Sequence, residues 1–303
     1  MAKRILITGA SGLIGTRLTE LLLLQGHEVV HLGRSQRKGY NPSFPWNVEK
    51  GTIDMRAMDS VDAIINLAGA GIADKRWTRA RKKEILNSRV QSTGLLYDVL
   101  RKGNHQVKAF VSASAIGYYG PGDENELFTE ASPAGIDFLA QVTKQWEEAS
   151  EKINSPDIRV VKLRIGIVLS EKGGALKSMA TPIKLGLGAA LGTGKQYLSW
   201  IHLDDLCAAF IKAVEDNSMR GVYNAVAIQP VTNLELTRGI AKVLKRPLWL
   251  PAVPAFVLRL MLGEVSALVT TGSKVSSEKI RKAGLTLIFT ELDSALRDLL
   301  RAK

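Results

Sequence analysis

Residues 8–15 read Thr8-Gly9-Ala10-Ser11-Gly12-Leu13-Ile14-Gly15, with glycine at every third position from Gly9. The apolar segment Arg4–Thr8 precedes this run, and a leucine-rich segment with helical spacing, Gly12–Gln25, follows it. Glycines between a strand and a helix permit a tight turn and let the backbone approach a pyrophosphate, which the helix N-terminus then faces. The stretch predicts a dinucleotide-binding turn rather than a glycine-rich loop without a ligand. We expect cofactor contacts from Thr8, Gly9, Ser11, Gly12, Leu13, Ile14 and Gly15.

From residue 4 to about residue 228, apolar runs bounded by turn residues alternate with longer segments of helical period. This alternation is typical of an α/β protein with a parallel sheet and crossover helices. The predicted strands are Arg4–Thr8, Glu28–Leu32, Ala63–Leu67, Ala109–Ser112, Arg159–Arg164 and Gly221–Asn224. The predicted helices are Gly12–Gln25, Ala80–Arg101, Asp137–Ile153 and Asp204–Glu215. The pattern therefore predicts a doubly wound Rossmann sheet.

The pattern changes after Thr232, where strand signals fade. Four further helices are predicted, at Asn233–Leu244, Pro254–Leu262, Ser276–Ala283 and Glu291–Arg301. We therefore divide the chain into a Rossmann domain, residues 1–228, with a substrate loop inserted at 171–200, and a small, mostly helical C-terminal domain, residues 229–303. The apolar surface of the segment after Pro254 is too broad for exposure on an isolated helix. We expect it to pack on the substrate side of the Rossmann domain and help close the cleft.

Composition limits the classes of protein to which the chain can belong. Hydrophobic residues make up 46% of the 303 residues and charged residues 23%, which is ordinary for a globular protein. A strand directly after Met1 leaves no room for a leader, so we expect a cytoplasmic protein. The apolar stretch 248–262 is short and interrupted by prolines, so no membrane span is expected. The one cysteine, Cys207, lies in an apolar helical pattern and is predicted to be a core residue.

The net charge of +12 raises the question of a nucleic-acid partner. Seven bases cluster between Asp74 and Arg89, yet no aromatic-interleaved or zinc motif accompanies them. A solvated helix face explains such a cluster better than nucleic-acid binding does. We therefore expect a small-molecule substrate, no nucleic acid and no metal site, and leave a homodimer open.

The end of the second predicted strand distinguishes between the two nicotinamide cofactors. An acidic residue there binds the ribose of NAD, whereas arginine accommodates the 2′-phosphate of NADP. The segment 31–38, His-Leu-Gly-Arg-Ser-Gln-Arg-Lys, has no acid and three bases. Arg34 and Ser35 are therefore predicted to bind NADP, with NAD less favoured, while solvation explains Arg37 and Lys38 equally well.

With these motifs, the chain resembles an extended short-chain dehydrogenase/reductase of the sugar-nucleotide epimerase type. It is most similar to the atypical subfamily called epimerase family protein, also labelled cell division inhibitor-like. The resemblance spans nearly the whole chain, through residues 9–15, 66–69, 112–120, 163–169, 186–188, 200–205 and 253–299. It implies that Asn66, Leu67, Ala68 and Gly69 line the cofactor and that Ser112 and Ser114 face the nicotinamide and substrate. Satisfaction of both serines by the backbone is the alternative.

The chain departs from this family at the catalytic pair. Family catalysis uses Tyr-x-x-x-Lys on one helix, but no tyrosine in this sequence has lysine four residues later. Alignment on Glu147 places Leu139 and Thr143 where tyrosine and lysine belong. Arg89 replaces the family's supporting asparagine and is assigned to the cofactor-binding residues.

Other residues are candidates for the missing role. Tyr118 and Tyr119 follow the serines and are flanked by glycines, with Lys144 as a partner, although tyrosines that pack a loop explain the pattern equally well. The loop Gly186–Lys195 lies where the family binds a substrate nucleotide, so Lys184 or Lys195 is a candidate for a phosphate contact. Solvation of that loop is the alternative.

Two functions follow from these observations. The first is an NADP-dependent oxidoreductase or epimerase with an atypical active site, acting on a small or nucleotide-linked substrate. The second is a non-catalytic NADP-binding sensor or partner-binding protein. The missing Tyr-x-x-x-Lys pair favours the second function, whereas the retained serine region and substrate loop favour the first.

Overall fold

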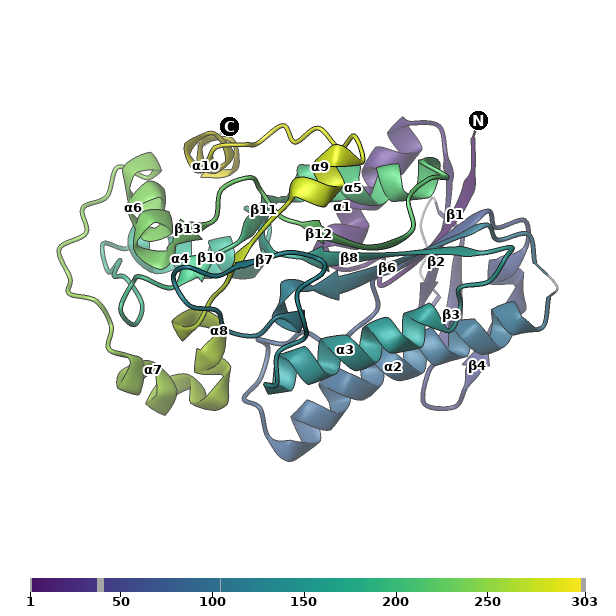
Figure 1. Ribbon diagram of the computed structural model, residues 1–303, viewed down its shortest axis with the longest axis horizontal. Coiled ribbons are helices and arrows are strands. Elements are labelled where there is room, and N and C mark those ends of the chain that lie inside the picture. The colour runs from purple at the N-terminus through teal and green to yellow at the C-terminus, as the bar shows by residue number, and fades with distance from the viewer. Residues whose placement is uncertain (1, 37–40, 104, 301–303) are drawn as a thin grey trace.

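The computed structural model of the protein describes residues 2–36, 41–103 and 105–300. Its central sheet has eight strands in the order β12-β8-β6-β5-β1-β2-β3-β4 (Figure 1). Their bounds are β1 Arg4–Thr8, β2 Glu28–Gly33, β3 Ser43–Asn47, β4 Thr52–Ile53, β5 Ala63–Asn66, β6 Ala109–Ala115, β8 Arg159–Ile165 and β12 Gly221–Ala225. All neighbouring pairs are parallel except β3 and β4. The predicted α/β fold with a doubly wound parallel sheet is confirmed.

Helices cover both faces of this sheet (Figure 1). One face carries α1 (Leu13–Leu24) and α5 (Leu203–Glu215), and the other carries α2 (Arg79–Arg101) and α3 (Phe138–Glu151). Successive side chains of a strand point to opposite faces, so Ile5 and Ile7 enter one core cluster and Leu6 enters another. Because both faces of the sheet are buried, each of these strands is a continuous run of apolar residues in the sequence. This is why the strands could be predicted from the sequence.

Sequence analysis missed two strands at the sheet edge, β3 and β4. The strand β3 contains Pro45, which stands opposite Gly33 of β2. Proline is compatible with a strand near the edge of a sheet, where fewer ladder hydrogen bonds are required, but it weakens the sequence signal of a strand.

The C-terminal helices share a core with the segment predicted as an inserted loop. Residues 171–200 contain the helix α4 (Gly174–Lys184), which packs with α6 (Asn233–Val243) and α10 (Leu292–Leu300). Short strands surround this cluster: β9 Ile167–Leu169, β10 Tyr197–Leu198, β11 Trp200–His202 and β13 Val231–Thr232. The buried residues of α4 recur at helical spacing as Leu176, Ala180 and Ile183. Much of the predicted loop is therefore regular structure that belongs to the second core.

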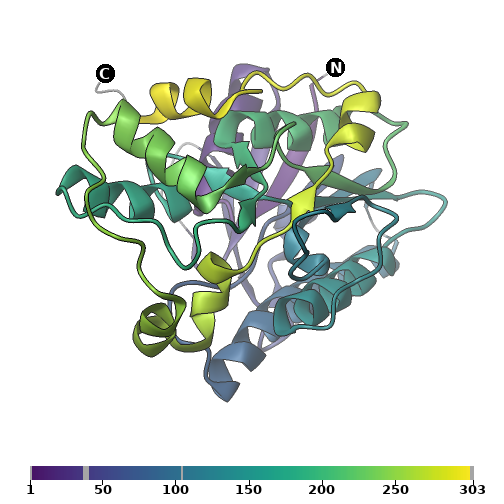
Figure 2. The ribbon, with the colours of Figure 1, turned by 60° about the vertical axis from the view of Figure 1, so that its left-hand side comes forward.

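The remaining elements are short, and most of them lie between the two cores, whereas η1 packs in the core of the large sheet (Figure 2). They are η1 Met55–Met58, η2 Ile116–Tyr118, β7 Leu127–Phe128, α7 Ala255–Leu262, η3 Gly263–Ser266, α8 Ala267–Thr270, β14 Lys274–Val275 and α9 Glu278–Lys282. Downstream of Thr232 the sequence suggested helices alone, but β14 forms a parallel pair with β7. Ile280 of α9 returns to the core of the large sheet. The C-terminal segment is thus packed against both parts of the molecule.

The residues 200–205 that contribute to the family resemblance attach this C-terminal segment. Both carboxylate oxygens of the buried Asp205 accept backbone hydrogen bonds, from Ile288 at 2.8 Å and from Phe289 at 3.0 Å. The His202 ring stacks on Phe289 with centroids 3.8 Å apart, and its Nδ1 accepts from the N–H of Asp204. This motif is therefore structural and joins α5 to the end of the chain.

The burial of helix α7 differs from the prediction. We expected its apolar surface to pack on the Rossmann domain, but only Leu258 of this helix is buried. Phe256 is 74% exposed and Leu260 is 79% exposed. The apolar contact with the large domain is made instead by the residues after α7, where Val265 packs in one cluster with Trp77. No helix in the described part of the chain is long and apolar enough to cross a membrane.

Candidate functional site

The glycine-rich turn joins β1 to α1 at the carboxyl edge of the sheet. Gly9 has φ +67°, and a Cβ there would lie 2.9 Å from the carbonyl of Leu67. A Cβ on Gly15 would lie 2.6 Å from the carbonyl oxygen of Gly9. Both glycines are therefore required for the turn itself, because real Cβ atoms do not approach backbone atoms so closely.

Gly12 has a different environment. It is the N-cap of α1 in an extended conformation, and the one atom close to a Cβ built there is the carbonyl oxygen of Gly9 at 3.3 Å. No side chain caps α1, and its first turn carries no acid. The positive end of the helix is thus open for an anion, in the geometry that Rossmann turns offer to a pyrophosphate.

A buried hydrogen-bond chain fixes the ends of the two central strands. The Thr8 hydroxyl donates to Asn66 Oδ1 at 2.7 Å and accepts from the N–H groups of Leu67 and Ala68, each at 3.1 Å. Asn66 Nδ2 then donates to Thr93 of α2 at 3.0 Å. The Thr8 and Asn66 side chains therefore position the segment 67–69, rather than pointing out of the protein.

Arg89 lies against this segment from α2. Its NH1 donates to the carbonyl oxygens of Ala70 and Ile85, each at 3.0 Å. Its Cζ would lie 3.1 Å from a Cβ on Gly69, so the missing side chain at Gly69 makes room for the guanidinium.

The charge of Arg89 has no carboxylate within 4 Å in the described residues. The guanidinium lies 5.1 Å from the centroid of Trp146, and burial lowers its pKa to about 10, with a further contribution from the charge of Arg81. A partly buried cation without a counter-ion is costly in the free protein. An anionic ligand at this place would remove that cost.

Arg34 and Ser35 follow the last residue of β2, Gly33, and both are exposed. The described part of the chain contains no ion pair to Arg34. The guanidinium is therefore available to a ligand that crosses the carboxyl edge of the sheet. Arg37 and Lys38 lie outside the described residues.

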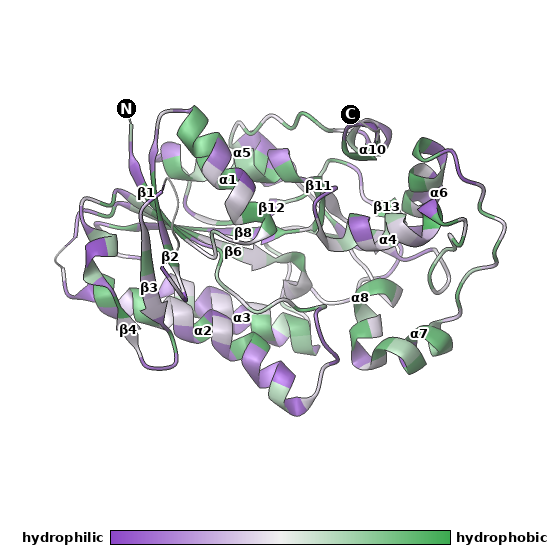
Figure 3. Ribbon diagram, turned by 180° about the vertical axis from the view of Figure 1, so that it is seen from behind, coloured by the Kyte–Doolittle hydropathy of each residue, from purple (hydrophilic) through white to green (hydrophobic). Residues whose placement is uncertain are grey.

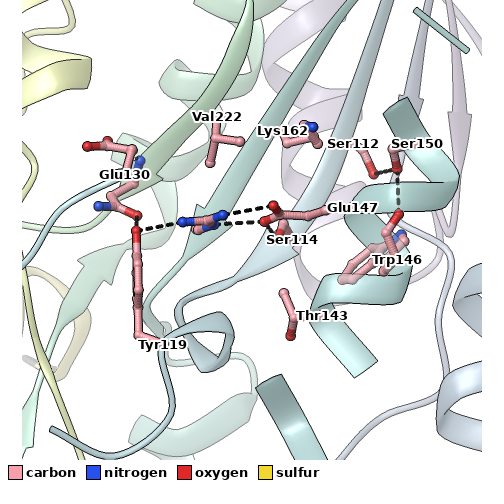
Figure 4. Close-up of polar contacts among 12 residues, drawn as sticks. Ser112, Ser114, Tyr119, Glu130, Thr143, Trp146, Glu147, Ser150, Lys162 and Val222 are labelled. Atoms are coloured by element: carbon pink, nitrogen blue, oxygen red, sulfur yellow. Dashed lines mark hydrogen bonds and ion pairs between the residues drawn. The ribbon is translucent and has the colours of Figure 1, made fainter. Parts of the chain in front are cut away.

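A buried polar network occupies the centre of the predicted catalytic region (Figure 4). Ser114 donates to Glu147 Oε1 at 2.6 Å, and Arg164 binds the same carboxylate through Nε at 2.8 Å and NH2 at 2.9 Å. Arg164 NH1 also donates to the Tyr119 hydroxyl at 3.0 Å, which in turn donates to Asn224 at 2.6 Å. All five residues are buried.

This network changes the roles expected for two catalytic candidates. The proton of Ser114 is engaged by Glu147, so this hydroxyl can accept a hydrogen bond but has no proton to offer. The Tyr119 hydroxyl has two partners, and burial raises its pKa although Arg164 opposes the shift. We therefore assign Tyr119 a core role, in place of the proton transfer considered from the sequence.

Ser112 also differs from expectation. Its side chain is fully buried, donates to the carbonyl of Ala113 at 2.9 Å and accepts from Ser150 of α3 at 3.2 Å (Figure 4). Neither bond leaves the hydroxyl facing a ligand. Satisfaction within the protein, the alternative stated above, describes this serine.

The positions of the missing catalytic pair lie beside η2. A Cβ built on Gly117 would be 3.4 Å from Leu139 Cβ and 3.9 Å from Thr143 Oγ1. The Thr143 hydroxyl donates to the carbonyl of Leu139 at 2.8 Å. Lys144 is exposed on α3 and cannot take the place of the family lysine in the buried network. The place of a tyrosine and a lysine is thus filled by an alkyl group and a backbone-bonded hydroxyl.

Tyr118 remains a candidate for proton transfer. Its ring is half-buried and lies over the Arg164 guanidinium, with 3.4 Å between Cζ and the ring centroid. Its hydroxyl has no hydrogen-bond partner in the described residues. Lys184 and Lys195, the candidates for a substrate phosphate, are both exposed. No group of three metal-binding side chains occurs in the described part of the chain.

Comparison with known proteins identifies the family. The family model for NAD dependent epimerase/dehydratase matches residues 5–226, and a domain of unknown function, DUF1731, matches residues 253–299. Epimerase family protein YfhF of Bacillus subtilis is 35% identical over 98% of this chain and 97% of its own length. The human epimerase family protein SDR39U1 is 34% identical over 98% of this chain and 99% of its own length.

Solved structures agree with this relationship. The crystal structure of human SDR39U1 with NADPH has a TM-score of 0.89 and 33% sequence identity, and the match covers 98% of each chain. MoeE5 in complex with UDP-glucose and NAD has a TM-score of 0.80 at 18% identity over 98% of this chain and 97% of its own, which shows a shared fold. The chain belongs to the NAD dependent epimerase/dehydratase family, and the predicted resemblance is confirmed.

The buried network generates a prediction about stability. Glu147→Leu leaves the Arg164 guanidinium buried without its carboxylate, which should lower the free energy of unfolding by about 3–5 kcal/mol. The exposed pair of Glu278 and Lys282 supplies a control, since Glu278→Leu should change the stability little. Urea denaturation of both variants measures the difference. Equal stability of the two variants would show that the network contributes nothing, whereas Glu147→Leu/Arg164→Met should recover part of the loss.

Proposed function

We propose that this member of the epimerase/dehydratase family binds NADP(H) across the carboxyl edge of its sheet and serves as an oxidoreductase or epimerase for a small or nucleotide-linked substrate. The observation that carries the proposal is the uncapped N-terminus of α1 behind Gly12, where a Cβ would extend into the space that a pyrophosphate requires. The NADPH-bound structure of human SDR39U1 supports the same ligand.

The charged residues around the turn fit this ligand. Arg34, exposed after β2, is placed to bind the 2′-phosphate that distinguishes NADP from NAD. Arg89, whose charge is uncompensated, would meet a phosphate oxygen or an anionic group of the substrate. The segment 67–69, held by Thr8, would line the cofactor through its backbone.

A bound nicotinamide supplies hydride transfer, and the chain must supply the proton and the orientation. Tyr118 is the candidate proton donor, because its hydroxyl has no partner in the described residues and it is the last residue of η2, which directly follows β6. Ser114 can orient a substrate hydroxyl by accepting its hydrogen bond, but cannot donate to a carbonyl while Glu147 holds its proton. This division of roles differs from the Tyr-x-x-x-Lys arrangement of the family.

A second function is favoured by one specific observation. Leu139 and Thr143 fill the positions of the catalytic pair, and the Thr143 hydroxyl is bonded to the backbone. A chain that kept the cofactor site and lost the proton donor would act as a non-catalytic NADP sensor or partner-binding protein. A cytoplasmic location and a homodimer are compatible with both functions and stay predictions.

The placement of the pyrophosphate is tested at Gly12. Gly12→Val should abolish NADPH binding while the chain stays folded, because the side chain occupies phosphate space without meeting the core. Gly94→Ala is the matched control: nothing lies within 4 Å of its Cβ on α2, so binding should stay unchanged. Titration calorimetry and thermal unfolding report both properties. Unaltered NADPH affinity in folded Gly12→Val would refute the placement.

Cofactor preference is tested at Arg34. Arg34→Ala should weaken NADPH binding by roughly 1.5–3 kcal/mol, the scale of a charge-assisted hydrogen bond, and leave NADH binding nearly unchanged. Arg101→Ala removes an exposed base at the far end of α2 and should change neither affinity. Equal losses for NADPH and NADH in Arg34→Ala would assign this residue a general electrostatic role and overturn the NADP preference.

Catalysis is tested by incubating the NADPH-loaded protein with metabolite mixtures while the absorbance of the reduced nicotinamide is followed. For a substrate found in this way, Tyr118→Phe should slow turnover by about 10²-fold or more and leave NADPH affinity unchanged. Tyr97→Phe on α2 serves as a control for the loss of a hydroxyl. Because an epimerase returns the hydride to its substrate, the products are also analysed for epimers. If no metabolite is converted by either readout while NADPH binds tightly, the result supports the sensor function. An unchanged rate in Tyr118→Phe would remove Tyr118 from catalysis.

A further inference from the structure

Large apolar side chains are exposed along one side of the C-terminal unit. They belong to two segments, the loop after α4 and the stretch 249–262, which includes α7. We call this surface the apolar edge: Leu185 (72% exposed), Leu187 (56%), Trp249 (67%), Phe256 (74%), Leu260 (79%) and Met261 (63%). A monomeric protein rarely leaves so many large apolar groups together in water unless they bind something.

The fold holds this edge in place. Trp249 Nε1 donates to the carbonyl of Gly186 at 2.9 Å, which attaches the segment before α7 to the loop after α4. Leu191 and Val253 then form a parallel bridge between the same two segments. The exposed groups are therefore presented by ordered backbone.

The helix α7 points its apolar residues in two directions. Leu258 is buried, while Phe256 and Leu260, which are four residues apart and so share one face of the helix, are exposed. Figure 3 shows α7 as a mostly hydrophobic helix. Arg76 of the large domain donates through NH2 to the carbonyl oxygens of Leu260 and Met261 at the end of α7. This bond caps the helix and fixes its orientation with the outer face turned to solvent.

The two segments that carry the apolar edge are rich in bases, and the first acid after α7, Glu264, is paired with Lys82. Residues 174–200 and 242–262 contain seven bases and no acid. These bases are all exposed: Lys177, Lys184, Lys195, Lys242, Lys245, Arg246 and Arg259. Among the described residues, Lys242 is the one of the seven that pairs with a carboxylate, that of Asp293. The surface thus combines an apolar strip with an uncompensated positive border.

We propose that the apolar edge docks on an anionic lipid surface, with Phe256, Leu260 and Trp249 entering the headgroup region and the surrounding bases binding lipid phosphates. Interfacial helices have this composition, with aromatic and leucine side chains on one face and bases beside them. A second copy of the chain is disfavoured because it would bring two positive borders together. Nucleic acid is disfavoured because four of the six exposed side chains are aliphatic Leu or Met, which offer no stacking platform for bases.

Vesicle binding tests this proposal with the full-length protein. Co-sedimentation should occur with vesicles of equimolar phosphatidylcholine and phosphatidylglycerol, not with phosphatidylcholine alone, and should weaken when the salt is raised to about 0.5 M. Phe256→Ser/Leu260→Ser should reduce binding about tenfold or more, because two large apolar groups are lost. Leu24→Ser/Ile288→Ser is the matched control, since Leu24 (80%) and Ile288 (71%) are equally exposed elsewhere and should not matter.

Fluorescence supplies a second readout. Four of the five tryptophans are buried, so Trp249 is the one that a lipid surface can reach, and its emission should shift to the blue with anionic vesicles. This shift should disappear in Trp249→Phe. Unchanged NADPH affinity in every variant shows that the fold is intact. No sedimentation with anionic vesicles, equal binding of the two double variants, or a dimer that dissociates in Phe256→Ser/Leu260→Ser would each overturn the proposal.

Discussion

The contact between the β1–α1 turn and the end of β5 is the constraint on which the rest of the site depends. Gly9 passes so close to the carbonyl of Leu67 that no side chain fits between them, and Thr8 bonds the backbone on the other side of the same junction. These two contacts fix the start of α1 relative to the segment 67–69. The start of α1 and the segment 67–69, where we propose that the cofactor binds, are thus held as one rigid edge.

Contacts at the end of the neighbouring strand β6 explain how the chain keeps its fold without the family's catalytic pair. The end of β6 is held by Glu147 and Arg164 through Ser114, and this buried ion pair needs neither the tyrosine nor the lysine. Leu139 and Thr143 stand in their places, and the Thr143 hydroxyl is satisfied by the backbone carbonyl of Leu139. A site whose architecture is independent of its catalytic groups can change its chemistry and keep its cofactor.

The C-terminal unit is attached to the large domain at two places. Asp205 holds the backbone at 288–289, and Arg76 holds the end of α7. The unit has a core of its own, which includes Trp200 and Leu296, and α7 lies outside this core. Its outer face is therefore free for a purpose other than folding.

The amino-acid sequence determined the features that are local in the chain. Glycines at fixed spacing between a strand and a helix predicted the turn, continuous apolar runs predicted the six main strands, and Arg34 without an acid nearby predicted the cofactor preference. The partners of the catalytic candidates came from far along the chain: Glu147 for Ser114 and Asn224 for Tyr119. A hydroxyl looks the same in the sequence whether its proton is free or engaged, so only the tertiary structure separated Tyr118 from Tyr119. The exposure of α7 was likewise decided by tertiary structure, because apolar periodicity shows that a face can be buried, whereas burial requires a neighbour to cover it.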